Sequence, residues 1–108
     1  MEEGIIVTLE NGARYYLIKE SFDKEENKKY FLAVGITDLD EINYTEVAMF
    51  NAEEEDGEEY LTRLDPESQE FINILTEQFY DQMIKENPGM EDELIKTLEK
   101  IVNEEKVA

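Results

Sequence analysis

The chain has 108 residues, of which 41% are hydrophobic, and its 29 acidic and 10 basic residues give a formal net charge of −19. This length suits one domain with one core, and the hydrophobic content argues against a chain that is disordered throughout. The acidic excess disfavours direct binding to nucleic acid or to an anionic membrane, and it favours a basic protein surface as the partner.

The N-terminal residues and the absence of cysteine indicate the compartment. Met1-Glu2-Glu3-Gly4 lacks the basic start and apolar run of a secretion signal, and no stretch approaches the roughly 20 apolar residues that span a bilayer. The chain has no cysteine, which excludes disulfides and suits a reducing compartment. We therefore expect a cytoplasmic protein without a membrane anchor.

The first third of the chain has the composition of β-strands. Residues 4–9 form a β-branched run that ends in Glu10-Asn11-Gly12, and Asn-Gly is a strong hairpin signal. The return strand is expected over residues 13–20, and a polar connection leads to a third strand over residues 28–36. In this third strand bulky apolar residues alternate with smaller apolar ones, so we expect it to be central in the sheet.

A second hairpin is expected next. Residues 44–51 resume the alternation of a strand, residues 52–58 are expected to turn around Asp56-Gly57, and residues 59–64 alternate again. Five strands joined by short connections make an antiparallel meander the simplest topology for residues 1–64. Aromatic residues favour half-buried strands, so we expect a sheet core that contains Tyr15, Tyr16, Tyr30, Phe31 and Phe50.

At Asp65 the spacing of apolar residues changes from two to about 3.6 residues. Asp65 can cap a helix and Pro66 suits the first helical position, so a helix is predicted over residues 65–87, ending before Asn87-Pro88-Gly89. Its apolar stripe is Phe71, Ile72, Leu75, Phe79 and Met83.

A second helix is predicted over residues 90–105. Its apolar face is Leu94, Ile95, Leu98, Ile101 and Val102, and this face packs beside the first helix or against a partner. The whole chain, residues 1–108, is therefore predicted to be a single α+β domain: an antiparallel sheet of about five strands followed by two C-terminal helices, with the first helix packed on the sheet.

The residues that most hydrolytic and metal chemistry requires are missing. The chain has no histidine and no cysteine, so it offers no Ser-His or Cys-His pair and no thiolate or imidazole zinc site. The calcium-loop pattern fails over residues 52–63, where Ala52 takes the first ligand position and Arg63 the glutamate position. No glycine-rich phosphate-binding motif occurs. We expect a protein that is not an enzyme, with no catalytic residues, no cofactor and no metal site.

The acidic run at the turn of the second hairpin is the segment that most invites a functional interpretation. One interpretation is a solvated hairpin end that maintains solubility and discourages edge pairing. The other is an electrostatic handle for a basic partner. In the second interpretation the partner-binding residues are Glu53, Glu54, Glu55, Asp56, Glu58 and Glu59.

Several of these segments together carry a family resemblance. They are Thr8-Leu9-Glu10-Asn11-Gly12, Phe22 followed by Lys29-Tyr30-Phe31-Leu32-Ala33-Val34, Glu46-Val47-Ala48-Met49-Phe50, Asp56-Gly57, and an acidic helix that contains Phe71 and Phe79. In these features residues 6–79 resemble the YrzB-like family of small acidic bacterial proteins, a domain of unknown function. The resemblance does not extend past Pro88. It implies a bacterial, cytoplasmic protein with no assigned activity.

Two functional hypotheses follow. The first is a non-enzymatic protein–protein interaction or regulatory module that binds a basic protein surface. The alternative is a nucleic-acid mimic that inhibits a DNA- or RNA-handling protein, for example an inhibitor of the anti-CRISPR or anti-restriction type. Alternate residues on a strand lie about 6.5 to 7 Å apart, which is comparable with adjacent phosphates. A small enzyme or metal-buffering protein is disfavoured by the missing residues, and the oligomeric state stays open.

Overall fold

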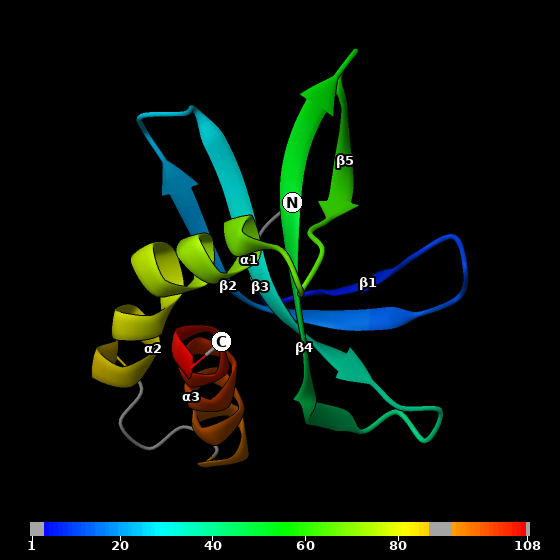
Figure 1. Cartoon of the computed structure of the whole chain (residues 1–108). Helices are drawn as coiled ribbons and strands as arrows, with labels where there is room; N and C mark the ends of the chain where they lie inside the picture. The colour runs from blue at the N-terminus through cyan, green and yellow to red at the C-terminus, as the bar shows by residue number, and fades with distance from the viewer. Residues whose placement is uncertain (1–3, 87–91, 108) are drawn as a thin grey trace.

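A computed structural model describes residues 4–86 and 92–107 of the chain. Five strands precede the helices, which confirms the α+β class (Figure 1). In chain order the elements are β1 Ile6–Thr8, β2 Arg14–Asp23, β3 Lys28–Ile36, β4 Ile42–Glu55, β5 Glu58–Arg63, α1 Gln69–Ile74, the π-helical segment η1 Leu75–Tyr80, α2 Asp81–Glu86 and α3 Asp92–Val107.

The five strands form one antiparallel sheet in the order β1-β2-β3-β4-β5. The expected meander with β3 at its centre is therefore confirmed, and β3 has the predicted bounds. The Asn-Gly hairpin between β1 and β2 is confirmed as well, since Gly12 adopts a φ of 89° and the Leu9 N–H donates to the Ala13 carbonyl at 2.8 Å.

One buried cluster joins sheet and helices. From β3 it contains Tyr30, Leu32 and Val34, and from β4 it contains Val47 and Met49. Its helical members are Phe71, Ile72, Leu75, Phe79, Met83, Leu94, Leu98 and Val102. Three residues of the predicted apolar face of α3, Leu94, Leu98 and Val102, are thus buried in the core of their own chain, whereas Ile95 and Ile101 are half-buried.

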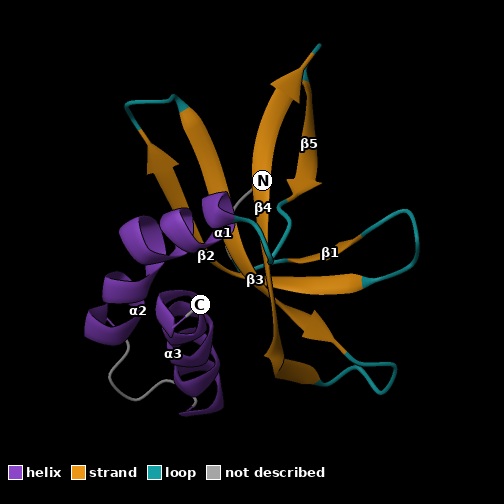
Figure 2. Ribbon diagram, in the orientation of Figure 1, coloured by secondary structure: helices purple, strands orange, loops and turns teal. Residues whose placement is uncertain are grey.

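A second buried cluster occupies the opposite side of β3 and contains only sheet residues: Tyr15, Leu17, Phe31, Ala33, Ala48 and Phe50. Among the described residues no helix contributes to this cluster, and the sheet covers it by curling (Figure 2). Val7 of β1 and Leu61 of β5 pack against it. The Tyr15 and Phe50 rings meet edge to face with centroids 5.4 Å apart. The predicted aromatic core is confirmed for four of its five residues, while Tyr16 is half-buried.

Two bulges bend the sheet. One lies between Leu17 and Lys19 in the β2–β3 pairing. At the other, Val34 pairs with Val47 whereas Gly35 pairs with Asn43, so β4 contains extra residues at this point. The Glu46 side chain lies where a Cβ on Gly35 would stand, so a glycine suits this position. Bulges increase strand twist, which fits the curled shape.

The start of the first helix differs from the prediction. The helix begins at Gln69, and its N-cap is Ser68, whose Oγ accepts a hydrogen bond from the Phe71 N–H at 3.2 Å. The prediction of Asp65 as the cap is wrong. Asp65 instead opens the preceding turn, where its Oδ1 accepts from the Glu67 N–H at 2.9 Å and its carbonyl accepts from the Ser68 N–H at 3.0 Å. Pro66 suits the second position of such a turn as well as it suits a helix start.

The first helix is continuous from α1 through η1 to α2, with a π-helical segment in its middle. Its predicted stop signal, Asn87-Pro88-Gly89, lies outside the described residues. The second helix, α3, is described from Asp92 to Val107. Its predicted first residues, 90 and 91, also lie outside the described part of the chain.

Candidate functional site

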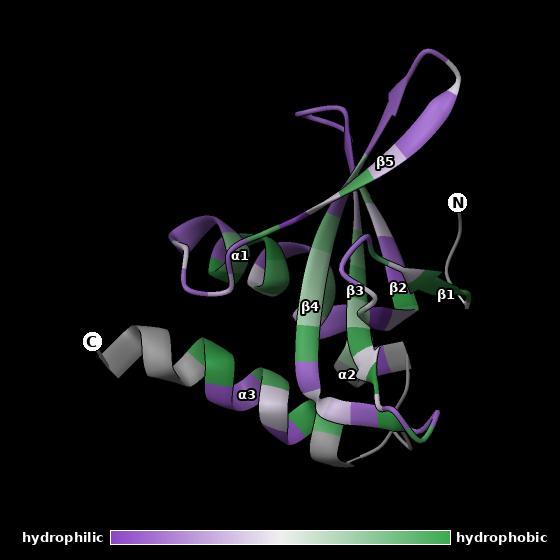
Figure 3. Cartoon of the chain, turned by 90° about the vertical axis from the view of Figure 1, so that its right-hand side faces the viewer, coloured by the Kyte–Doolittle hydropathy of each residue, from purple (hydrophilic) through white to green (hydrophobic). Residues whose placement is uncertain are grey.

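All six candidate partner-binding residues lie at the end of the β4–β5 hairpin, and all six are exposed. We call Glu53, Glu54, Glu55, Asp56, Glu58 and Glu59 the acidic tip. The hairpin end is strongly hydrophilic and extends beyond the rest of the sheet (Figure 3). All six partner-binding residues that the sequence analysis proposed therefore lie together on one hairpin.

The acidic tip is a regular hairpin rather than a seven-residue turn. The expectation of a turn over residues 52–58 is corrected, because β4 continues to Glu55 and β5 begins at Glu58. Only Asp56 and Gly57 form the turn, with φ values of 54° and 81°. Positive φ at both central residues defines the tight turn whose twist matches that of paired strands. The carboxylates are consequently held in a fixed order along a ladder.

This ladder places like charges opposite each other. Glu54 pairs with Glu59, and Glu55 pairs with Glu58. Directly opposed like charges destabilise an antiparallel pair, and no lysine or arginine occurs between residues 53 and 60 to separate them. The tip thus concentrates negative charge in an arrangement that a bound cationic group would stabilise.

Two neutral side chains hold carboxylates of the tip in place. The Tyr60 hydroxyl donates to Glu58 Oε2 at 2.8 Å, and this hydrogen bond raises the pKa of the Tyr60 hydroxyl. Asn51 Nδ2 donates to Glu53 Oε1 at 3.0 Å. Asn51 is itself 9% exposed, so it is a buried polar residue at the foot of an exposed acidic hairpin.

A cleft of about 540 Å³ separates the acidic tip from the β2–β3 hairpin. We call it the hairpin cleft. The β3–β4 ladder ends at the pair of Lys29 with Ala52, and beyond this pair the two hairpins diverge (Figure 1). One wall carries Phe22, Lys28 and Lys29, and the other carries Glu53, Glu54 and Glu59, with Asn51 also lining the cleft. Sequence analysis missed Phe22, Lys29 and Asn51. Of these three residues, the sequence pattern could have singled out Asn51, because it is a polar residue directly after the apolar run 47–50.

A second cleft, of about 750 Å³, lies between the β1–β2 hairpin and β5. Val7 and Leu9 line one side, and Tyr60 and Leu61 line the other. β1 and β5 are the two edge strands of the sheet, so this cleft marks the place where the curled sheet does not close on itself.

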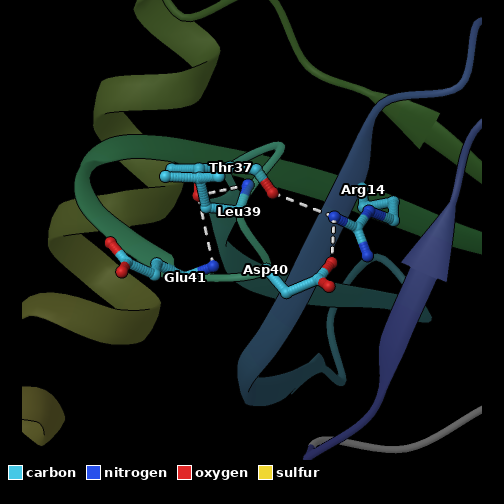
Figure 4. Close-up of polar contacts among 5 residues, drawn as sticks. All are labelled: Arg14, Thr37, Leu39, Asp40 and Glu41. Atoms are coloured by element: carbon cyan, nitrogen blue, oxygen red, sulfur yellow. Dashed lines mark hydrogen bonds and ion pairs between the residues drawn. The ribbon is translucent and has the colours of Figure 1, made fainter.

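The loop between β3 and β4 is also acidic, but a cation neutralises part of its charge. Arg14 Nη2 contacts Asp40 Oδ1 at 2.6 Å and donates to the Thr37 carbonyl at 2.9 Å (Figure 4). The Thr37 hydroxyl accepts from the N–H groups of Leu39 and Glu41 at 3.3 and 3.1 Å. These bonds hold the β3–β4 loop in its conformation, so its polar groups have a structural role. The acidic tip is therefore the stronger candidate for binding a partner.

Across residues 4–86 and 92–107, no three histidine, cysteine or acidic side chains are grouped as a metal site would require. Within the same ranges no helix is both long and apolar enough to cross a membrane. The two aromatic rings that cations approach, Tyr15 beneath Arg63 and Phe31 beneath Lys29, are buried core rings.

Comparison with known proteins found no matching family, no matching curated protein and no matching solved structure. The resemblance of residues 6–79 to the YrzB-like family stays a prediction from the sequence.

Proposed function

We propose that the chain is a non-enzymatic protein-interaction module that binds a basic surface of a partner protein through the acidic tip. The observation that carries this proposal is the pairing of Glu54 with Glu59 and of Glu55 with Glu58 on one exposed hairpin. A solubility device needs only scattered charges, whereas opposed carboxylates on a tight hairpin destabilise the free protein. A basic partner offsets this repulsion when it binds.

The proposal includes the predicted packing of the first helix on the sheet. Shared membership of Tyr30 and Phe71 in one buried cluster supports this packing, as does the 2.6 Å hydrogen bond from Ser21 Oγ of β2 to Gln78 Oε1 of η1. In this arrangement the helices occupy one face of the sheet, and the acidic tip extends away from them toward solvent (Figure 1).

The test begins with affinity capture from the cell of origin and identification of the partner by mass spectrometry. A variant with Glu53, Glu54, Glu55 and Glu58 all replaced by glutamine is then compared with the unaltered chain. We expect the variant to fold, because exposed charges contribute little to stability, and to bind the partner more weakly and with a smaller dependence on salt. Affinity is measured at two ionic strengths, since steering charges act most strongly at low salt.

A matched control removes the same number of charges elsewhere. Glu25→Gln, Glu77→Gln, Asp81→Asn and Glu99→Gln all replace exposed carboxylates away from the tip. Retained affinity in this control shows that the position of the charges matters and not only the net charge. Unchanged affinity and salt dependence in the tip variant would refute the proposal, and the helix face with Glu77, Asp81 and Glu99 would become the candidate surface.

The alternative function, mimicry of nucleic acid, draws support from one feature of the tip. Glu53 and Glu55 lie in a regular strand, so they share a face with a spacing of about 6.8 Å. This spacing is comparable with that of adjacent phosphates along one strand. Competition distinguishes the alternatives: a captured DNA- or RNA-handling protein that releases the chain when nucleic acid is added supports mimicry. A partner whose binding is insensitive to nucleic acid argues against it.

A further inference from the structure

The two edge strands of the sheet lie on opposite sides of one cleft. This cleft of about 750 Å³, which we call the edge cleft, is lined by Val7 and Leu9 from the β1–β2 hairpin and by Tyr60 and Leu61 from β5. In the described part of the chain, neither β1 nor β5 pairs with a strand on its outer side (Figure 2). Edge strands present unpaired backbone N–H and C=O groups, so both walls of the edge cleft can bind a further strand.

The directions of the strands restrict how the sheet can close across the edge cleft. Each neighbouring pair is antiparallel, so β1, β3 and β5 run in one direction and β2 and β4 run in the other. Direct pairing of β5 with β1 would therefore be parallel, in an otherwise antiparallel sheet. One additional strand, antiparallel to both β1 and β5, would instead close the sheet into an antiparallel barrel of six strands.

Hydrogen bonds near the ends of β1 identify its backbone groups that point into the edge cleft. The Leu9 N–H donates to the Ala13 carbonyl at 2.8 Å, so the backbone of Leu9 is directed toward β2. Backbone groups of an antiparallel strand alternate in direction, and Val7 is therefore also directed toward β2. The backbones of Ile6 and Thr8 consequently point outward, into the edge cleft.

The same reasoning applies to β5. The Leu64 N–H, just after this strand, donates to the Met49 carbonyl of β4 at 2.9 Å. By alternation the backbone of Thr62 is also directed toward β4. The backbones of Leu61 and Arg63 therefore point outward, toward β1.

These two sets of backbone groups fit one regular strand. The side chain of Leu61 packs against the buried cluster that contains only sheet residues, whereas Ile6 and Thr8 belong to neither buried cluster. Side chains and backbone groups of a strand both alternate with a period of two residues. An inserted strand would therefore bond to β5 through its inward-facing residues and to β1 through its outward-facing residues. Direct pairing of β5 with β1 would place residues from different faces opposite each other.

The surroundings of the edge cleft indicate the chemistry of the inserted strand. Val7, Leu9 and Leu61 are half-buried and pack against the sheet-only cluster, so inward-facing apolar side chains would extend that cluster. Glu10 also lines the cleft, and in the described part of the chain no lysine or arginine does. Glu59 already has interaction partners, so the attraction depends on Glu10 and on the net charge of −19. This charge favours basic outward-facing residues, and it disfavours a strand from a second copy of the same chain.

We propose that the edge cleft binds an extended segment of a partner protein, with alternating apolar and basic residues, as a sixth strand between β1 and β5. Binding at the edge cleft goes beyond the proposed function, because it uses the backbone edges of two strands and not the carboxylates of the acidic tip. It also gives the barrel the closing strand that five alternating strands cannot supply.

A synthetic peptide allows a test without the natural partner. The probe is an acetylated hexapeptide of alternating valine and lysine, which in extended form spans about 20 Å, the length of a six-residue strand such as β5. Its control contains three valines followed by three lysines, so composition and charge are equal and the alternation is lost. Two further peptides carry N-methyl groups, either on all valines, which removes the donors to β5, or on all lysines, which removes the donors to β1.

Calorimetry and ¹⁵N-detected amide hydrogen exchange measure the result. The alternating peptide should bind at least about tenfold more tightly than the block peptide, and each N-methylated peptide should lose about tenfold in affinity. Binding should slow amide exchange at Ile6, Thr8, Leu61 and Arg63. Exchange that stays unchanged at these four amides while the peptide binds would overturn the edge-cleft site. Loss of affinity with only one N-methylated peptide would overturn the insertion between two strands, because the peptide then pairs with one edge.

A change in the protein provides a second test. The side chain of Thr8 is exposed and its N–H points into the edge cleft, so Thr8→Pro removes one donor without interrupting the β1–β2 ladder. It should weaken peptide binding, whereas the control Thr8→Ala should bind normally. If Thr8→Pro does not fold, the N-methylated peptides still decide the question.

Two further measurements separate the edge cleft from its alternatives. The free chain should sediment as a monomer; a concentration-dependent dimer with the same four amides protected would overturn the partner segment, because a second copy would then supply the strand. The variant with Glu53, Glu54, Glu55 and Glu58 replaced by glutamine should still show the four protected amides when saturated with peptide. Protection in that variant, together with unchanged binding of the captured partner, would refute the proposed function and leave the edge cleft standing. Absence of protection in the unaltered chain, with partner binding that depends on the acidic tip, would do the reverse.

Discussion

Replacement of Leu98 by alanine tests whether α3 belongs to the core. Leu98 is fully buried, and it shares its cluster with Met49 of β4 and Leu75 of η1. The change removes three carbon atoms, which corresponds to about 2.4 kcal/mol at about 0.8 kcal/mol per buried carbon. The residual cavity adds to this value, so we expect a loss of about 3 to 4 kcal/mol in the free energy of unfolding.

Urea denaturation followed by circular dichroism measures this loss, which should also lower the melting temperature by about 12 °C or more in a chain of this size. Glu99→Ala is the control, because Glu99 is the next residue of α3 and is exposed. It should change the unfolding free energy by less than about 0.5 kcal/mol. A loss below about 1 kcal/mol for Leu98→Ala would refute the burial of α3, and its apolar face would then be available to a partner.

Three further predictions concern the hairpin turn, a buried tyrosine and the net charge. Gly57→Ala should destabilise the β4–β5 hairpin by about 1 kcal/mol without altering any charge, because Gly57 has a φ of 81°; denaturant unfolding that matches the unaltered chain would contradict this. Burial raises the pKa of the Tyr30 hydroxyl, with further contributions from nearby carboxylates. The folded chain holds this proton more tightly than the unfolded chain, so the resulting stability is present below about pH 10 and is lost as the pH rises further. Between pH 9 and pH 11 the free energy of unfolding of the unaltered chain should therefore fall more than that of the Tyr30→Phe variant. The net charge of −19 repels itself, so thermal melting should shift upward as sodium chloride is raised from low to physiological ionic strength; a flat or falling melting temperature would argue against self-repulsion as a significant term.

The strand order and the acidic tip were predictable because they depend on local patterns. Alternation over residues 28–36 indicated a central strand, and the Asn-Gly and Asp-Gly pairs indicated where two of the hairpins turn. Consecutive hairpins leave little choice of topology, so the meander followed from them. The helix start was less predictable, since Asp65 and Ser68 are both good caps and only the turn around Pro66 decided between them.

The sequence by itself therefore determined which segments are strands and helices and where negative charge is concentrated. Only the tertiary structure showed that the sheet curls to bury Tyr15 against Phe50, and that Leu98 belongs to the same buried cluster as Met49. The hairpin cleft is also a tertiary feature, because Phe22 and Glu54 are far apart in the chain and meet only where the β3–β4 ladder ends. Local periodicity specifies the face on which a side chain lies. Which distant side chains share that face depends on register, bulges and curvature, and these arise only when the whole sheet is assembled.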